Sequence, residues 1–241
     1  MATSVSYDFS GSVVLVSGGA SGIGAATARA CAARGARVIV ADVYEDGLAA
    51  IGRVAGVEAH KLDVAEASAV AALVAGIDRI DAAVLCAAVQ RRKPVDEMSD
   101  AEWRRHMAVN LDGVFHFVRA VVPVMRRQRS GAVLAFTSGL VNTGWPGASA
   151  YAASKGALIG LIKCVAQELR PYGVRANVLS PGLVATPVFL DVATEEEVAM
   201  YRDSVGISEP EDVVPTVLHL ISDASRNLTG AVIERRLVPA R

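Results

Sequence analysis

The chain has 241 residues, of which 52% are hydrophobic and 20% are charged, and its formal net charge is -1. This length is suited to one α/β domain with a large core, so residues 1–241 are expected to form a single domain. A net charge near zero provides no bulk attraction for nucleic acid or for an anionic membrane surface, and neither is an expected partner. The composition fits small-molecule chemistry better.

The N-terminal stretch 1–12 has no basic region followed by an apolar run, and no window approaches the apolar length needed to span a bilayer. We therefore expect a soluble, cytoplasmic protein. The cysteines Cys31, Cys86 and Cys164 are widely spaced in apolar surroundings, unlike a disulfide or metal framework. They are interpreted as reduced core residues, and no metal site is expected. A functional role stays open only for Cys86, because it ends an apolar strand where functional loops begin.

Short apolar runs rich in β-branched residues alternate with helical segments along the chain. The runs are residues 13–16, 37–41, 82–85, 132–136 and 175–179. Such alternation is typical of a parallel sheet, and continuous rather than alternating hydrophobicity is typical of strands covered on both faces. The sequence predicts an α/β fold, a Rossmann-type doubly wound parallel sheet of about seven strands with helices on both faces.

Two helix starts carry capping-box signatures, Ser99 with Glu102 and Ser208 with Glu211. Residues 100–129 are expected to form one long helix that bends near Pro123, which lacks a backbone donor. Asn110 lies inside this helix although asparagine is a poor helix former. A functional role and a local kink both explain its presence.

A glycine-rich turn follows the first predicted strand, with the sequence Ser17-Gly18-Gly19-Ala20-Ser21-Gly22-Ile23-Gly24, and an alanine-rich helical segment comes next. Glycines let the backbone approach a pyrophosphate, and the free N–H groups at a helix start attract its negative charge. By itself the cluster also fits an ordinary tight turn. The candidate cofactor residues of this turn are Gly18, Ser21, Gly22, Ile23 and Gly24.

Asp42 ends the second predicted strand, about 20 residues further on, where a carboxylate can accept hydrogen bonds from the adenosine ribose. The same carboxylate repels a ribose 2′-phosphate, and neither Ser21 nor Val43 supplies a cation, so NAD(H) is expected in preference to NADP(H). Asp63 and Val64 follow the third strand and are candidates to frame the adenine. For Asp63 a helix-capping role is nearly as good an interpretation.

Tyr151 and Lys155 are four residues apart in a predicted helix, so their side chains share one face. Taken alone, such a pair is most often a pair of surface neighbours. A phenol with a pKa of about 10 needs stabilisation of about 4 kcal/mol to act as a base near neutrality, which one cation at about 4 Å supplies. Ser138 follows residues 132–136 at the carboxyl edge of the sheet, where it is either a site residue or a turn cap.

These motifs together resemble the short-chain dehydrogenase/reductase family over nearly the whole chain. The residues that carry the resemblance are the turn 17–24, Asn110, Ser138, Tyr151, Lys155, Pro181-Gly182 and Thr186-Pro187. The resemblance implies that Tyr151 is the acid/base, that Lys155 lowers its pKa and binds the nicotinamide ribose, that Ser138 orients the substrate oxygen, and that Asn110 holds a relay water. It also implies nicotinamide contacts from Pro181, Gly182, Val184 and Thr186.

The chain departs from the family pattern at two places. Leu85-Cys86-Ala87-Ala88 stands where the family usually has Asn-Asn-Ala-Gly, so that only backbone contacts from Leu85 and Ala87 to the cofactor are expected to survive. Glu234-Arg235-Arg236-Leu237 replaces the usual Asp-Gly-Gly in a region that commonly builds the tetramer interface. A homo-oligomer is expected, with a tetramer as the first choice and a dimer as the second.

Residues 187–206 are expected to form a lid, with Val188, Phe189, Leu190, Met200 and Tyr201 lining an apolar substrate pocket or packing the lid on the core. Arg91, Arg92 and Lys93 are candidates to engage an acidic substrate group, although such a run is more often solvated.

The leading hypothesis is an oxidoreductase that interconverts a secondary alcohol and a ketone with NAD(H), acting on a small-molecule substrate that is a cyclic or bicyclic metabolite. A 3-oxoacyl thioester reductase is the alternative within enzymes, for which NADPH is the usual cofactor. A dinucleotide-sensing regulator without catalysis is the alternative from a different class. The departures at 85–88 and 234–237 motivate that reading, and the intact Tyr151 and Lys155 oppose it.

Overall fold

The computed structural model describes residues 5–236. Within them, parallel strands form one 7-stranded sheet in the order β3-β2-β1-β4-β5-β6-β7. The strands are β1 (Val13–Ser17), β2 (Arg37–Asp42), β3 (Val57–Lys61), β4 (Ala82–Leu85), β5 (Gly131–Phe136), β6 (Val174–Ser180) and β7 (Val232–Glu234). The predicted Rossmann-type α/β fold is confirmed.

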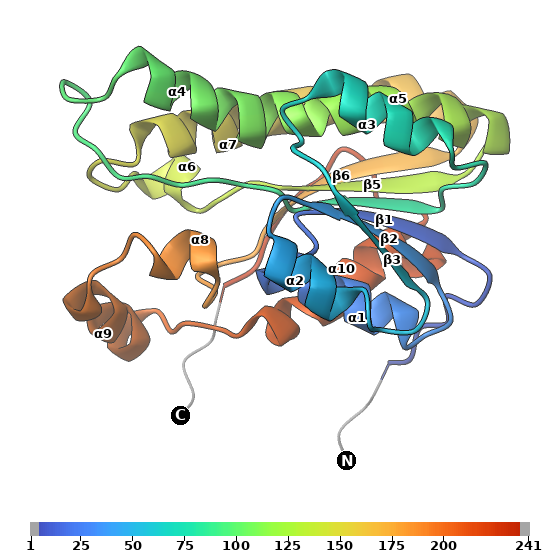
Figure 1. Ribbon diagram of the computed structural model, residues 1–241, viewed down its shortest axis with the longest axis horizontal. Helices are drawn as coiled ribbons and strands as arrows, with labels where there is room; N and C mark the ends of the chain where they lie inside the picture. The colour runs from blue at the N-terminus through green and yellow to red at the C-terminus, as the bar shows by residue number, and fades with distance from the viewer. Residues whose placement is uncertain (1–4, 237–241) are drawn as a thin grey trace.

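Helices cover both faces of this sheet, so the molecule has three layers (Figure 1). One layer contains α3 (Ala67–Ala75), α4 (Asp100–Met107), α5 (Gly113–Gln128) and α7 (Ser149–Leu169), and the opposite layer contains α1 (Gly22–Ala32), α2 (Glu45–Ile51) and α10 (Pro210–Ile221). The short helices α6 (Leu140–Thr143), α8 (Pro187–Leu190) and α9 (Glu195–Ser204) lie beyond the carboxyl ends of the strands. Single 3₁₀ turns occur at Arg170–Tyr172 and Asp223–Ser225.

The central strands are buried on both faces, which explains their uninterrupted hydrophobicity. Every residue of β1 is buried, with Leu15 in the hydrophobic cluster on the α5 and α7 side and Val14 and Val16 in the cluster on the α1 and α10 side. Successive side chains of a strand point to opposite faces, so one apolar run contributes to two cores. The edge strand β3 is exposed at most of its positions.

The predicted long helix departs from regular geometry at a different place from the one expected. A π-helical turn at Ala108–Asp112 joins α4 to α5, and it contains Asn110. Helix α5 continues through Pro123 to Gln128. The irregularity therefore coincides with the asparagine, as π turns often do at functional positions.

Contrary to the sequence expectation, the helix Asp100–Gln128 is long and apolar enough to cross a membrane by length and composition alone. Its apolar face packs in the core, where Phe117, Val121 and Met125 are fully buried. A core helix of this length passes the same test, so the finding is weak support for a membrane span.

Of the two predicted capping boxes, the one formed by Ser99 and Glu102 is confirmed. The other is wrong, because α10 begins at Pro210 with Glu209 as its N-cap residue, and the Glu209 N–H donates to Asp212 Oδ2 at 2.9 Å. Proline at the first helical position sets this start.

The interpretation of the cysteines is wrong at one position. Cys31 is a buried core residue, whereas Cys164 lies on an exposed position of α7. The apolar neighbours of Cys164 in the sequence face inward from the other side of the helix, and sequence proximity did not reveal this.

Candidate active site

One cavity of about 660 Å³ opens at the carboxyl edge of the sheet. Its walls come from segments that follow all seven strands, beginning with the glycine turn after β1 and ending with residues 234–236 after β7. Loops meet at this edge because parallel strands all end there, and it is where open α/β sheets bind ligands. The chain's functional candidates therefore converge although they are far apart in the sequence.

The glycine turn packs too tightly for side chains. Gly18 has a φ of 66°, and a Cβ there would lie 2.5 Å from the backbone nitrogen of Ala87. A Cβ on Gly24 would collide with the Gly18 carbonyl oxygen. Within the described residues the Ser21 side chain does not cap α1, so the first N–H groups of the helix remain available at the cavity. This cradle fits a pyrophosphate.

Asp42 is fixed at the end of β2 by backbone donors. Its Oδ2 accepts a hydrogen bond from Ala20 N–H at 2.9 Å, and its Oδ1 accepts bonds from Val43 N–H at 2.7 Å and Tyr44 N–H at 3.0 Å. The carboxylate is half-buried on the cavity wall, and the backbone donors keep its remaining acceptor capacity in one place. A rigid acceptor at this position fits a ribose diol.

Asp63 and Val64 also lie on the cavity wall. Asp63 Oδ1 accepts a bond from Ala65 N–H at 3.0 Å within the turn before α3, and its Oδ2 pairs with Arg105 Nη1 at 3.0 Å. The helix-capping interpretation of Asp63 is wrong, because the N-cap residue of α3 is Glu66. Arg105 itself lies on the wall, and the sequence argument did not include it. The positive charge of Arg105 is therefore partly neutralised by Asp63 on the same wall.

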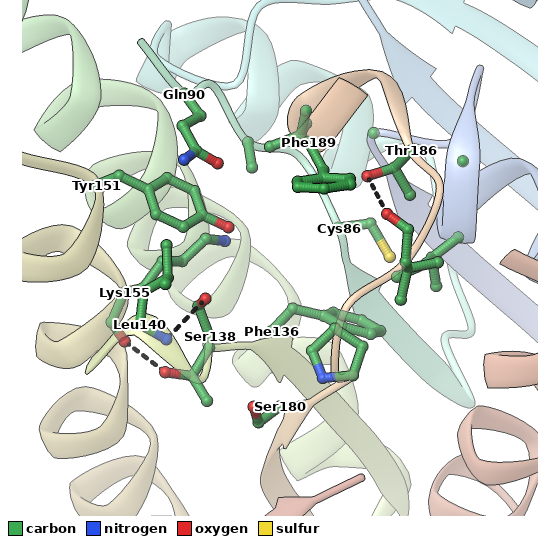
Figure 2. Close-up of a pocket in the computed structure, with 18 of the residues that line it drawn as sticks. Cys86, Gln90, Phe136, Ser138, Leu140, Tyr151, Lys155, Ser180, Thr186 and Phe189 are labelled. Carbon is green, nitrogen blue, oxygen red and sulfur yellow. Dashed lines mark hydrogen bonds between the residues drawn. The ribbon is translucent and has the colours of Figure 1, made fainter. Parts of the chain in front are cut away.

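Tyr151 lies in the first turn of α7 with its hydroxyl directed into the cavity, and Lys155 lies one helical turn further on (Figure 2). The Lys155 Nζ is 5.8 Å from the centre of the Tyr151 ring. Ser138 follows β5 on the same wall, where its Oγ also accepts a bond from Leu140 N–H at 3.2 Å. The turn-cap interpretation of Ser138 is confirmed, and its place on the cavity wall leaves the predicted role as a site residue open.

Burial shifts the two titratable groups in opposite directions. It raises the pKa of Tyr151 to about 12, which the Ser138 hydroxyl partly offsets. It lowers the pKa of Lys155 to about 8. In the protein alone the phenol is therefore protonated at neutral pH. The expectation that Lys155 lowers the pKa of Tyr151 is wrong for the protein alone, because the loss of hydration dominates.

Asn110 is fully buried and does not line the cavity. Its Oδ1 accepts a bond from Val89 N–H at 2.8 Å, and its Nδ2 donates to Val89 O at 2.9 Å and to Ser154 Oγ at 3.0 Å. Ser154 Oγ in turn donates to the carbonyl of Tyr151 at 2.8 Å. The Asn110 side chain thus connects the loop after β4 to the helical turn that carries Tyr151.

The segment 85–88 reaches the cavity only in part. Leu85 is fully buried in the core and does not line the cavity, so its predicted cofactor contact is limited to what its backbone can make. Cys86, Ala87 and Ala88 do line it. Burial raises the pKa of the Cys86 thiol to about 12, so this thiol is neutral and has low nucleophilicity.

The opposite wall contains Pro181, Gly182, Val184 and Thr186, for which the family resemblance implies nicotinamide contacts. Gly182 has a φ of 80°, and a Cβ there would lie 2.9 Å from the carbonyl oxygen of Arg235. The unusual tail is therefore part of the cavity, which Glu234, Arg235 and Arg236 help to line. Leu237 lies outside the described residues.

The polar tail groups are paired within the protein. Arg235 Nη1 donates to Pro181 O at 3.2 Å and to Ser208 Oγ at 2.9 Å. Glu234 accepts a bond from Asn142 Nδ2 at 3.0 Å and pairs with Arg236 at 2.9 Å. These contacts connect the tail with the loop after β6 and with α6.

Two residues of the segment 187–206 form an aromatic cluster at the cavity with Trp145, which follows α6. Trp145, Phe189 and Tyr201 pack against one another with ring centres 6.2–6.3 Å apart, and all three line the cavity. Val188 also lines it. Leu190 and Met200 do not, because they are 45% and 52% exposed and point outward.

Arg92 holds α9 against the loop after β4. Its guanidinium lies 3.9 Å from the centre of the Trp145 ring and makes an ion pair with Glu197 at 2.7 Å, and both charged side chains are 23% exposed. Its Nε donates to Pro146 O at 3.1 Å. Lys93 pairs with Glu102 at 3.1 Å. These two cations are therefore engaged by the chain itself and are not simply solvated.

The fold and the cavity define a dinucleotide-binding oxidoreductase of the Rossmann type. A family model described as enoyl-(acyl carrier protein) reductase matches residues 18–234. With the relatives described next, this match shows that the chain belongs to the short-chain dehydrogenase/reductase family, whose members act on CH–OH and C=O groups with nicotinamide dinucleotides.

The relatives cover nearly the whole chain. The short-chain reductase protein NovJ of Streptomyces niveus is 39% identical over 92% of this chain and 91% of its own length. The 3-oxoacyl-[acyl-carrier-protein] reductase FabG of Thermotoga maritima is 35% identical over 92% and 95%. The cyclopentanol dehydrogenase of Comamonas sp. is 36% identical over 91% and 93%.

The lowered pKa of Lys155 predicts a pH-dependent cost to folding. Between pH 8 and 10.5 the unfolded lysine still holds a proton that the folded one has lost, so stability rises with pH in this window. Below pH 8 the cost is complete, about 3 kcal/mol. In urea unfolding of the cofactor-free protein, the stability that Lys155→Met gains over the wild type should fall from this value towards zero as the pH rises from 8 to 10.5.

The matched control is Lys163→Met, at an exposed position of the same helix. Its stability difference from the wild type is expected to stay constant over the same pH range. A Lys155→Met difference that is equally constant would contradict the lowered pKa.

The Arg92–Glu197 pair predicts the local stability of α9. Glu197→Gln keeps a capping partner for Thr194, since glutamine serves in a capping box, but removes the charge. Loss of a charge-assisted bond worth about 1.4 kcal/mol is expected to make hydrogen exchange of the α9 amides about tenfold faster. The measurement is hydrogen exchange followed by mass spectrometry.

Glu211→Gln makes the same change in the exposed pair with Arg29, whose side chains are 65% and 51% exposed. Exposed ion pairs contribute little to stability, so in this control the exchange of the α10 amides is expected to stay within about twofold of the wild type. Equal behaviour of the two variants would show that the Arg92 contact does not hold α9.

Proposed function

We propose that this protein reversibly interconverts a secondary alcohol and a ketone with NAD(H), with Tyr151 as the acid/base. The observation that carries the proposal is that Tyr151, Ser138 and Lys155 share one wall of the cavity, while the glycine turn and Asp42 form its other end. The nicotinamide of a dinucleotide whose pyrophosphate is held by that turn would supply or accept the hydride.

The residues then have separate tasks. In the reducing direction, Tyr151 donates its hydroxyl proton to the carbonyl oxygen, which Ser138 holds by a hydrogen bond. Lys155 provides positive charge next to the phenolate that remains and binds the nicotinamide ribose. Because its pKa of about 12 keeps Tyr151 protonated in the protein alone, the group is already in the form that reduction needs.

Asp42 supports the choice of NAD(H). Its carboxylate is fixed by backbone donors where the adenosine ribose would lie, and a second carboxylate, Asp63, lines the same region. A 2′-phosphate there would meet negative charge. Arg105 is the nearby cation, and its ion pair with Asp63 reduces its attraction for a phosphate.

The substrate is proposed to be a small cyclic ketone or alcohol. The aromatic cluster of Trp145, Phe189 and Tyr201 offers flat apolar surfaces above the reacting groups, and one relative is named a cyclopentanol dehydrogenase. Reduction of a 3-oxoacyl thioester is the second candidate, supported by the relative named as such a reductase.

We also infer a homo-oligomer in the cytoplasm, with a tetramer preferred to a dimer, formed by residues 1–241 as one domain. Large apolar side chains on the outside of the α4–α5 helix support self-association, because Trp103 and Phe115 are each 41% exposed.

The proposed chemistry is tested with Tyr151→Phe. Loss of the proton donor should lower kcat for NADH-dependent reduction of cyclopentanone and cyclohexanone by about 10³-fold, while binding of NADH, measured by fluorescence, is retained. The control is Tyr172→Phe, whose ring lies 5.0 Å from Arg126 and away from the cavity. Tight NADH binding by the wild type without turnover of any ketone or 3-oxoacyl thioester would favour the non-catalytic sensor instead.

The cofactor preference is tested with Asp42→Ala. The wild type is expected to favour NADH over NADPH by about 100-fold in kcat/KM, and the variant should lose at least about tenfold of that ratio. A ratio measured on one preparation is independent of how much protein is folded. Asp46→Ala, an exposed carboxylate of α2, is the control. A wild-type preference for NADPH would overturn the NAD(H) proposal and favour the thioester reductase.

A further inference from the structure

Gln90 is a polar side chain on the cavity wall that has no task in the proposed chemistry. It is 7% exposed and lines the cavity, with its amide on the same side of the view as Tyr151 (Figure 2). Within the described residues, its buried Nε2 has no hydrogen-bond partner. Buried amides without a partner are rare in proteins, and one that borders a cavity indicates a partner supplied from the cavity.

The backbone on both sides of Gln90 is held by buried side chains. Asn110 bonds both the N–H and the carbonyl of Val89, and His106 Nε2 accepts a bond from Arg91 N–H at 3.1 Å. His106 is 2% exposed, and its Nδ1 is 2.8 Å from the carbonyl of Glu102. The Gln90 amide is therefore presented to the cavity by a rigid segment, which is how specific recognition groups are built.

The charges around Gln90 restrict the kind of group that it recognises. The next residue, Arg91, is exposed and does not line the cavity, and the cations after it, Arg92 and Lys93, are paired with Glu197 and Glu102. Because they are paired, Arg92 and Lys93 provide no strong attraction for an anion at this position. An amide both donates and accepts, so its best partner is a neutral hydroxyl or carbonyl.

We propose that Gln90 is a specificity-determining residue that hydrogen-bonds a second oxygen on the substrate, so that the preferred substrate is a cyclic ketone bearing a hydroxyl or a further carbonyl group. This inference rests on the proposed function, since it assigns the substrate class of the same site. The aromatic cluster would hold the ring, and Gln90 would select its orientation.

The first test is Gln90→Met, which keeps the length of the side chain and removes the amide. The probes are cyclohexanone and its 2-hydroxy, 3-hydroxy and 4-hydroxy derivatives, reduced with NADH. In the wild type at least one hydroxy derivative should exceed the parent ketone in kcat/KM by about tenfold, the range of one hydrogen bond in a dry site. In Gln90→Met the ratio of the two kcat/KM values should fall to about one.

A second measurement separates this inference from the proposed function. If the wild type reduces none of the ketones, the proposed function fails, and calorimetry then measures binding of the same four compounds to the protein saturated with NADH. A hydroxyl advantage in Kd that Gln90→Met removes supports the role of Gln90 even then. Equal advantages in the two proteins, or no advantage in either, overturn it.

Thermal unfolding without any ligand tests the structural alternative. Gln128 is the matched control, because its amide bonds both the N–H and the carbonyl of Ile80 at 2.8 and 2.9 Å. Gln128→Met should lower the melting temperature, whereas Gln90→Met should leave it unchanged or raise it, since no protein partner is lost. A fall in Gln90→Met as large as that in Gln128→Met would show a structural role and overturn the proposal.

Discussion

The Asn110 amide is the contact on which the geometry of the cavity depends. It is fully buried in a π-helical turn, and it joins the backbone of Val89, after β4, to Ser154 and through it to the carbonyl of Tyr151. A buried amide that lost these partners would leave several polar groups unsatisfied at once. The π turn therefore has a structural reason, because it lets one side chain fix the loop after β4 relative to the helical turn that carries Tyr151.

The central part of the sheet was predictable from the sequence, and its edges were not. Strands such as β1 and β6 are buried on both faces, so hydrophobicity alone marks them. The edge strand β3 carries Glu58, His60 and Lys61 in exposed positions, and β7 has only the residues Val232–Glu234. Edge strands that are exposed or short carry no continuous apolar run in the sequence. Such a strand is defined mainly by its hydrogen bonds to the neighbouring strand.

The place of Asp42 and Ser138 on the cavity wall was predictable because residue type and strand end coincide there. That of Tyr151 followed from its helical spacing to Lys155. The roles of Gln90 and Arg92 depend on contacts across long sequence separations. Arg92 meets a carboxylate more than a hundred residues away, in α9, and no local pattern predicts that pairing. The misplaced cap at Ser208 has a local cause instead, because Pro210 rather than the serine sets the helix start.

Burial moves the pKa values of two side chains on the cavity wall apart, to about 8 for Lys155 and about 12 for Tyr151. Both shifts favour the neutral forms of these side chains, because burial removes the water that would stabilise their charges. Any charge introduced beside them is weakly screened and acts strongly on both. A cationic ligand group would favour the phenolate and oppose the lysine charge, so the protonation of both groups depends on what fills the cavity.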